Sequence, residues 1–250
     1  MVAVLSLAVG AYAAPTITNV GWGFTNVYAV QGDDGVILVD AHNPGNEDRI
    51  LRRLEAAGIA PERLTLLVAT HGHPDHAGST AALADRLGIP VAGGAADLPY
   101  FASGTTELHP TGSRGRMISA FVRRAFPPVS LDLAVTDRLD LGPYGVAGEL
   151  VVVGGHTPGS LIVDLHDGDV LSGDLIRSHL QRRHVPTLHF FHDDPVAASR
   201  ALRTVVDGGA TTLWPSHGGS LAAADVAAWM TRTHRDPAAV DVASATTVAP

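Results

Sequence analysis

His71, His73, Asp75 and His76 occur within a stretch of six residues. Imidazole nitrogens and carboxylate oxygens are ligands for zinc and its first-row neighbours, and both groups are largely deprotonated, and so able to bind, near pH 7. In an extended segment His71 and His73 point to the same side, whereas Asp75 and His76 lie on the turn that opens a helix. One ion cannot easily take four ligands from so short a segment, so the spacing predicts two metal ions.

The apolar run Leu64 to Ala69 directly precedes these ligands. Its length and composition predict a short buried strand. Open α/β sheets tend to place their functional sites beyond the carboxyl ends of strands. The histidines are therefore expected at that edge of a sheet.

Strands and helices alternate along the chain in two similar halves. Predicted strands in the first half are Val20 to Val30 and Gly35 to Asp40, joined by a hairpin turn. Predicted helices are Asn46 to Gly58, Ser79 to Gly88 and, in the second half, Pro195 to Asp207. Such a chain is expected to form two sheets packed face to face with helices outside.

His-x-His-x-Asp-His after an apolar strand resembles the metallo-β-lactamase fold superfamily of metal-dependent hydrolases. Three later features match the same pattern, each after an apolar run: His156 in Gly-Gly-His-Thr-Pro-Gly, Asp174 in Ser-Gly-Asp, and His217 in Ser-His-Gly-Gly. The likeness covers residues 17 to 230, approximately. It implies an α/β fold of the four-layer αββα sandwich type.

The resemblance also implies how the ligands divide between two Zn²⁺ ions, with Fe or Mn as alternatives. His71, His73 and His156 would hold the first ion, and Asp75, His76 and His217 the second. Asp174 would bridge the two, opposite a bridging water or hydroxide that attacks the substrate. Asp75 is the candidate catalytic residue, because it could orient the nucleophile or pass a proton to the leaving group.

Supporting and pocket residues are expected near these ligands. Asp40, at the end of a predicted strand, occupies the place where the family usually has an acidic residue beneath the metals. Thr157 adjoins a ligand and could hydrogen-bond to the site. Arg177 could face the pocket and grip an anionic substrate, although a surface position is favoured. His42 and His179 are possible pocket residues, and the remaining histidines, including His189 and His192, are expected to be surface or structural residues.

The chain, of 250 residues and 46% hydrophobic, predicts one hydrolase domain over residues 15–235. Residues 1–14 form an apolar segment that resembles a secretory signal but lacks its positively charged start, so localisation stays open between the cytoplasm and export. No other segment is expected to cross a membrane. Residues 236–250 are expected to be a loose tail.

Residues 97–130, between the two halves, are a candidate lid insertion. Ser113 to Phe126 has apolar residues at helical spacing with arginines among them. The favoured interpretation is an amphipathic helix whose apolar face packs on the body. The alternatives are a lid that offers an apolar wall and arginines to an anionic substrate, and a helix on a membrane surface.

Charge and cysteine content exclude several classes of function. The net charge of -8 argues against nucleic acid as a general partner. The absence of cysteine excludes disulfides, thiolate ligands and a cysteine nucleophile. The expected partner is a small-molecule substrate.

The expected function is hydrolysis of a small ester, thioester or lactone by a dinuclear zinc centre. β-Lactamase activity is disfavoured, because true β-lactamases of this fold generally lack the aspartate that corresponds to Asp174. The motifs resemble the glyoxalase II branch more closely. However, only 33 residues follow His217, which is too few for the C-terminal domain of glyoxalase II. A mononuclear iron persulfide dioxygenase and a phosphodiesterase of the same fold remain alternatives.

Overall fold

The computed structural model describes residues 14–233. The signal-like segment 1–14, except for Ala14, and the predicted tail 236–250 lie outside the described residues. None of the described helices is both long enough and apolar enough to cross a membrane.

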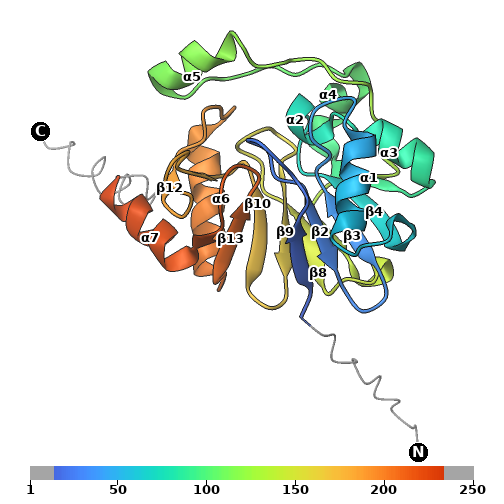
Figure 1. The fold of residues 1–250 in the computed structure, drawn as a ribbon. Helices are drawn as coiled ribbons and strands as arrows, with labels where there is room; N and C mark the ends of the chain where they lie inside the picture. The colour runs from blue at the N-terminus through green and yellow to red at the C-terminus, as the bar shows by residue number, and fades with distance from the viewer. Residues whose placement is uncertain (1–13, 234–250) are drawn as a thin grey trace, which may run out of the picture.

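Two six-stranded mixed sheets form the centre of the molecule (Figure 1). The first has the order β1-β2-β3-β4-β5-β6, and the second has the order β14-β13-β10-β9-β8-β7. The strands of the first sheet are β1 (Thr16–Asn19), β2 (Tyr28–Gln31), β3 (Val36–Val39), β4 (Leu64–Ala69), β5 (Val91–Gly94) and β6 (Leu133–Val135). Those of the second are β7 (Arg138–Asp140), β8 (Gly148–Val152), β9 (Leu161–Leu165), β10 (Asp169–Gly173), β13 (Thr212–Pro215) and β14 (Leu221–Ala222). A separate hairpin pairs β11 (Arg177–Ser178) with β12 (Pro186–Thr187).

Helices cover the outer face of each sheet (Figure 1). On the side of the first sheet lie α1 (Glu47–Ala56), α2 (Pro74–Ala77), α3 (Thr80–Leu87) and α4 (Leu98–Ser103). On the side of the second sheet lie α6 (Pro195–Asp207) and α7 (Ala223–Arg232). The predicted four-layer αββα sandwich is therefore confirmed.

Strand β4 is buried on both faces, as its uninterrupted apolar sequence predicts. Leu66 and Val68 belong to the core between the two sheets, whereas Leu67 and Ala69 pack in the core beneath α1 and α3. Because alternate side chains fill both cores, a shift of one residue would leave every side chain on the wrong face. This double burial fixes where β4 ends and the ligand segment begins.

The predicted strand from Val20 to Val30 is too long, because only its last residues, Tyr28 to Val30, belong to a strand, β2. A loop separates β1 from β2, closed by a hydrogen bond from the Val20 amide to the Val27 carbonyl (2.8 Å). The Asn26 amide donates to the carbonyl of Ser216, next to a predicted ligand (2.8 Å). The loop leaves the sheet because these bonds draw it toward the second half of the chain.

The predicted helix from Ser113 to Phe126 is also wrong in extent and in packing. Helix α5 (Gly112–Ser119) ends early, because the chain turns back and pairs with residues 104–106 through bonds such as Phe126 amide to Gly104 carbonyl (2.8 Å). Met117 and Phe121 are 65% and 87% exposed. The apolar face is not packed on the body, and α5 projects beyond the ends of the sheets (Figure 1).

Candidate metal centre

The candidate ligands converge because the strands before them end at the same edges of the two sheets. His71 follows β4, and His156 follows β8 after a short turn. Asp174 and His217 follow β10 and β13, which are parallel neighbours. A hydrogen bond from the Leu161 amide to the Thr70 carbonyl (2.8 Å) joins the second sheet to the first ligand segment.

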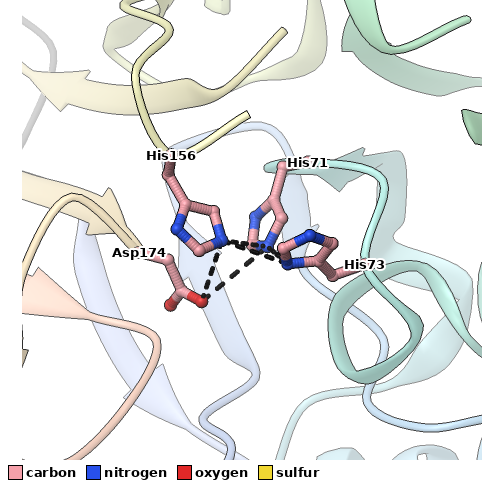
Figure 2. Close-up of side chains that lie close together, drawn as sticks. All are labelled: His71, His73, His156 and Asp174. Atoms are coloured by element: carbon pink, nitrogen blue, oxygen red, sulfur yellow. Dashed lines mark hydrogen bonds and ion pairs between the residues drawn. The ribbon is translucent and has the colours of Figure 1, made fainter. Parts of the chain in front are cut away.

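Three imidazoles face one another in the first ligand group (Figure 2). His71 Nε2 lies 3.0 Å from His73 Nδ1, and His156 Nε2 lies 3.1 Å from each of them. Asp174 Oδ2 is 3.7 Å from His71 Nε2 and 3.5 Å from His156 Nε2. Two ligands on one tetrahedral zinc, with bonds of about 2.0–2.1 Å, are about 3.3 Å apart. The group therefore has the dimensions of a zinc site.

A second group shares the same aspartate oxygen. Asp75 Oδ2 is 3.5 Å from both His76 Nε2 and His217 Nε2. Asp174 Oδ2 is 3.3 Å from each of these nitrogens. One carboxylate oxygen thus lies between both groups of imidazoles.

Hydrogen bonds on the far side of the rings determine which nitrogen carries the proton. His76 Nδ1 is 2.8 Å from Asp40 Oδ2, His156 Nδ1 is 2.9 Å from the Phe191 carbonyl, and His217 Nδ1 is 2.8 Å from the Phe24 carbonyl. These oxygens only accept, so each Nδ1 donates and each neutral ring presents a bare Nε2 to the centre. The lone pairs on these Nε2 atoms lie 3.3–3.5 Å from the Asp174 carboxylate and repel it unless a cation lies among them. The donor set fits divalent metal ions.

Electrostatics lead to the same conclusion. Burial would lower the pKa of His76, but Asp174, Asp75 and Asp40 together raise it well above its usual value. Burial lowers the pKa of His71 and of His156 well below the usual value, so both are neutral near pH 7. The first group therefore offers neutral ligands, and the second favours positive charge between its carboxylates.

Asp40 anchors the site from beneath. Its Oδ1 accepts hydrogen bonds from the amide (2.9 Å) and hydroxyl (2.8 Å) of Thr70, and its Oδ2 accepts from Ser216 Oγ (3.0 Å) in addition to His76. Asp40 adopts a left-handed conformation with φ of 65°, which aspartate tolerates better than most residues. One carboxylate thus ties both ligand segments of the second group together.

Comparison with known families decides the identity. The family model of the metallo-β-lactamase superfamily matches residues 20–217, a range that includes all seven candidate ligands. The chain belongs to this superfamily.

Named relatives agree with this assignment. A protein of Anaeromyxobacter dehalogenans named "Hydroxyacylglutathione hydrolase" is 33% identical over 153 residues, which cover 61% of this chain and 46% of the relative. A Bacillus subtilis protein named "Probable metallo-hydrolase YflN" is 25% identical over 71% of this chain and 75% of its own length. The chain thus spans less than half of the first relative. Both relatives are named as hydrolases.

Solved structures show the same fold. A subclass B3 metallo-β-lactamase of Bradyrhizobium japonicum has a TM-score of 0.59 and 22% identity over 82% of this chain and 75% of its own. A metallo-β-lactamase of Cronobacter sakazakii has a TM-score of 0.59 and 22% identity over 82% of this chain and 78% of its own. At this identity the likeness concerns the fold alone.

Asp97 is a buried residue whose role the sequence does not reveal. Its Oδ2 accepts from the Gly72 amide (2.9 Å) and from Thr157 Oγ1 (2.7 Å), and its Oδ1 accepts from the Gly159 amide (2.7 Å). Thr157 therefore contacts Asp97, which joins the segment of His71 to the segment of His156. In the sequence, Asp97 before Leu98-Pro99 indicates only a helix start.

His189 and His192 are also buried, which excludes the surface alternative for both residues and leaves the structural one. His189 Nε2 lies 3.2 Å from Asp174 Oδ2, and its ring is stacked on His217 with centroids 5.3 Å apart. Burial lowers the pKa of His189 to about 3. No spacing rule could have revealed this residue, because it lies in an irregular segment before α6.

Arg177 is buried in β11, so the favoured surface interpretation is wrong for it too. Its guanidinium lies 4.0 Å over the ring of Phe190, and its Nε has no hydrogen-bond partner within residues 14–233. Burial, with a smaller effect of Arg114, lowers its pKa to about 10. Phe24, 44% exposed, lies 6.5 Å from Phe190 and is stacked on His217. We call Phe24, Phe190 and Arg177 the aromatic wall.

The insertion holds the segment that carries His189. Thr111 donates from its amide to the Phe190 carbonyl (2.7 Å) and from its hydroxyl to the His189 carbonyl (2.6 Å). The His192 amide donates to the His109 carbonyl (2.9 Å). The chain before α5 therefore positions residues beside the metal centre, although the apolar face of α5 is exposed.

Proposed function

We propose that this chain is a dinuclear zinc hydrolase that cleaves a small ester, thioester or lactone. The observation that carries the proposal is the position of Asp174 Oδ2, within 3.3–3.7 Å of ligand nitrogens from both groups. A single oxygen shared in this way suits a carboxylate that bridges two ions. Bound zinc polarises a carbonyl and lowers the pKa of a bound water toward neutrality.

The seven proposed ligands are His71, His73 and His156 for the first ion, Asp75, His76 and His217 for the second, and Asp174 for both. Imidazole donors favour zinc and its first-row neighbours over magnesium and calcium. Asp40, through His76, and Asp97, through the two loops of the first group, hold these ligands in place. Residues that hydrogen-bond to metal ligands commonly raise metal affinity by about 10- to 100-fold.

Asp75 is the proposed catalytic residue. Its side chain is 28% exposed, whereas the imidazoles that it faces are buried. Although burial opposes this, His76 and His217 hold its pKa well below the usual range. Asp75 is therefore ionised at neutral pH, can orient a water by accepting its hydrogen bond, and can take a proton from that water and pass it to the leaving group.

The aromatic wall is the proposed substrate-binding surface. Phe24 and Phe190 offer apolar area beside His217, and Arg177 adds a cation for an anionic group on the substrate. A thioester substrate is supported by the hydroxyacylglutathione hydrolase of Anaeromyxobacter dehalogenans. β-Lactam substrates stay disfavoured, because Asp174 is present and the sequence contains no cysteine.

The test is elemental analysis of the purified protein together with rates on a panel of thioesters, lactones and phosphodiesters. We expect about two zinc ions per chain and turnover of esters, thioesters or lactones. One iron per chain, with oxygen consumption on a persulfide and no hydrolysis, would overturn the proposal in favour of a dioxygenase. Turnover of phosphodiesters alone would exclude esters, thioesters and lactones as the substrate class.

A further inference from the structure

We propose that His189 is an eighth metal ligand, which binds the second ion together with Asp174 and His217. The inference rests on the two-metal centre proposed above. It goes beyond that centre because the resemblance assigns seven ligands and none of them comes from the segment between β12 and α6.

The distances carry the assignment. His189 Nε2 is 3.2 Å from Asp174 Oδ2, and the corresponding distances of His76 and His217 are both 3.3 Å. All three agree with the separation of about 3.3 Å between two ligands of one tetrahedral zinc. The ligand atoms of Asp174, His189 and His217 all lie within 4.8 Å of one another. They are close enough to share an ion after a small adjustment.

The orientation of the ring is that of a ligand histidine. His189 Nδ1 is 3.2 Å from the carbonyl of Phe191, and the same carbonyl is 2.9 Å from Nδ1 of His156. A carbonyl oxygen has two lone pairs and can accept from both rings. Metal-bound histidines usually donate their other ring nitrogen to such an acceptor. One backbone oxygen thus turns two imidazoles toward the centre, one for each ion.

The segment is held rigidly enough to supply a ligand. His189 is buried and stacked on His217 with an angle of 17° between the ring planes. Thr111 of the insertion donates to the carbonyl of His189 and to that of Phe190. The second ion would then have three imidazoles and two carboxylates, and the insertion would be part of the metal centre's support.

A different role would require a different proton position. The Phe191 amide is also 3.3 Å from His189 Nδ1. If that amide donates to Nδ1, the proton lies on Nε2, and His189 donates a hydrogen bond to Asp174 instead of binding metal. The two roles therefore differ in which ring nitrogen is protonated.

The experiment compares His189→Gln with His192→Gln, which removes another buried histidine from the same segment. Both variants and the wild type are titrated with Co²⁺, and the dissociation constants of the two ions are measured by competition with a chromophoric chelator. We expect His189→Gln to bind the first ion normally and the second at least about 10-fold more weakly. We expect a changed visible spectrum of the second cobalt ion, and wild-type behaviour in His192→Gln.

A measurement on the wild type keeps the test independent of whether the variants fold. In zinc-loaded protein labelled with ¹⁵N-histidine, a ligand role requires a proton on Nδ1 of His189 and none on Nε2. A proton on Nε2, or unchanged affinity and spectrum of the second ion in His189→Gln, would overturn the inference while leaving the two-metal centre intact. A wild type that binds a single ion would instead refute the proposed function itself.

Discussion

Replacing Asp97 by asparagine is expected to loosen the first ligand group without removing a ligand. The carboxylate accepts three hydrogen bonds, two at Oδ2 and one at Oδ1. Asparagine has one oxygen, which can keep the bonds from Gly72 and Thr157. Its amide nitrogen then faces the amide of Gly159, which loses its acceptor.

The magnitude follows from these contacts. A hydrogen bond to a charged group contributes about 1.5–3 kcal/mol, and a neutral one about 0.5–1.5 kcal/mol. The hydrogen bond from Gly159 to the charged carboxylate is lost, and the bonds from Gly72 and Thr157 become bonds to a neutral amide oxygen. Part of the loss is offset because burial raises the pKa of Asp97, so the ionised carboxylate carries a desolvation cost that asparagine avoids. We expect a net loss of about 2–4 kcal/mol, or a Tm lower by about 4–16 °C.

The assay combines thermal unfolding with stepwise metal titration. Asp97→Asn should lower the affinity for the first ion by about 10- to 100-fold, because the segments of His71 and His156 are no longer joined. Asp132→Asn is the control, since Asp132 accepts one backbone hydrogen bond, from Val91 (2.9 Å), at the start of β5. Wild-type Tm and wild-type affinity in Asp97→Asn would refute the reasoning. Lower Tm with unchanged affinity would restrict Asp97 to supporting the fold.

Three further predictions follow from the site. Asp174→Ala should bind fewer than two ions by elemental analysis, because the shared oxygen is lost; two tightly bound ions with full activity would exclude the bridging role. Arg177→Gln should raise KM for anionic substrates by about 10-fold but leave neutral ones unchanged, with the exposed Arg182→Gln as control; equal KM values would place Arg177 outside the pocket. The metal-free protein should lose stability as pH falls below about 6.5, measured by urea unfolding at several pH values. The folded state holds more histidines with lowered than with raised pKa values, so it binds fewer protons than the unfolded state; unchanged stability at pH 5.5 would contradict this. The lowered group is His42, His71, His73, His156 and His189, and the raised group is His76 and His217.

The sequence by itself predicted the sandwich fold and the seven candidate ligands, and the family resemblance implied how the ligands divide into two groups. The fold and the ligand motifs depend on local patterns, because apolar runs long enough for buried strands are followed closely by imidazoles and carboxylates. Helices α1, α3 and α6 were also predictable from local patterns, and Asp194 caps α6 by accepting hydrogen bonds from Val196 and Ala197 (2.9 Å each).

Only the tertiary structure decided what surrounds those ligands. Asp97 joins segments on either side of it through bonds to residues 25 and 62 positions away, and His189 reaches Asp174 from an irregular loop. Arg177 is buried because Phe190 covers it, and α5 is short because the chain after it pairs with residues 104–106. Each of these features depends on contacts between distant segments. Residue types and spacing carry no record of such contacts, because they form only when the two halves pack together.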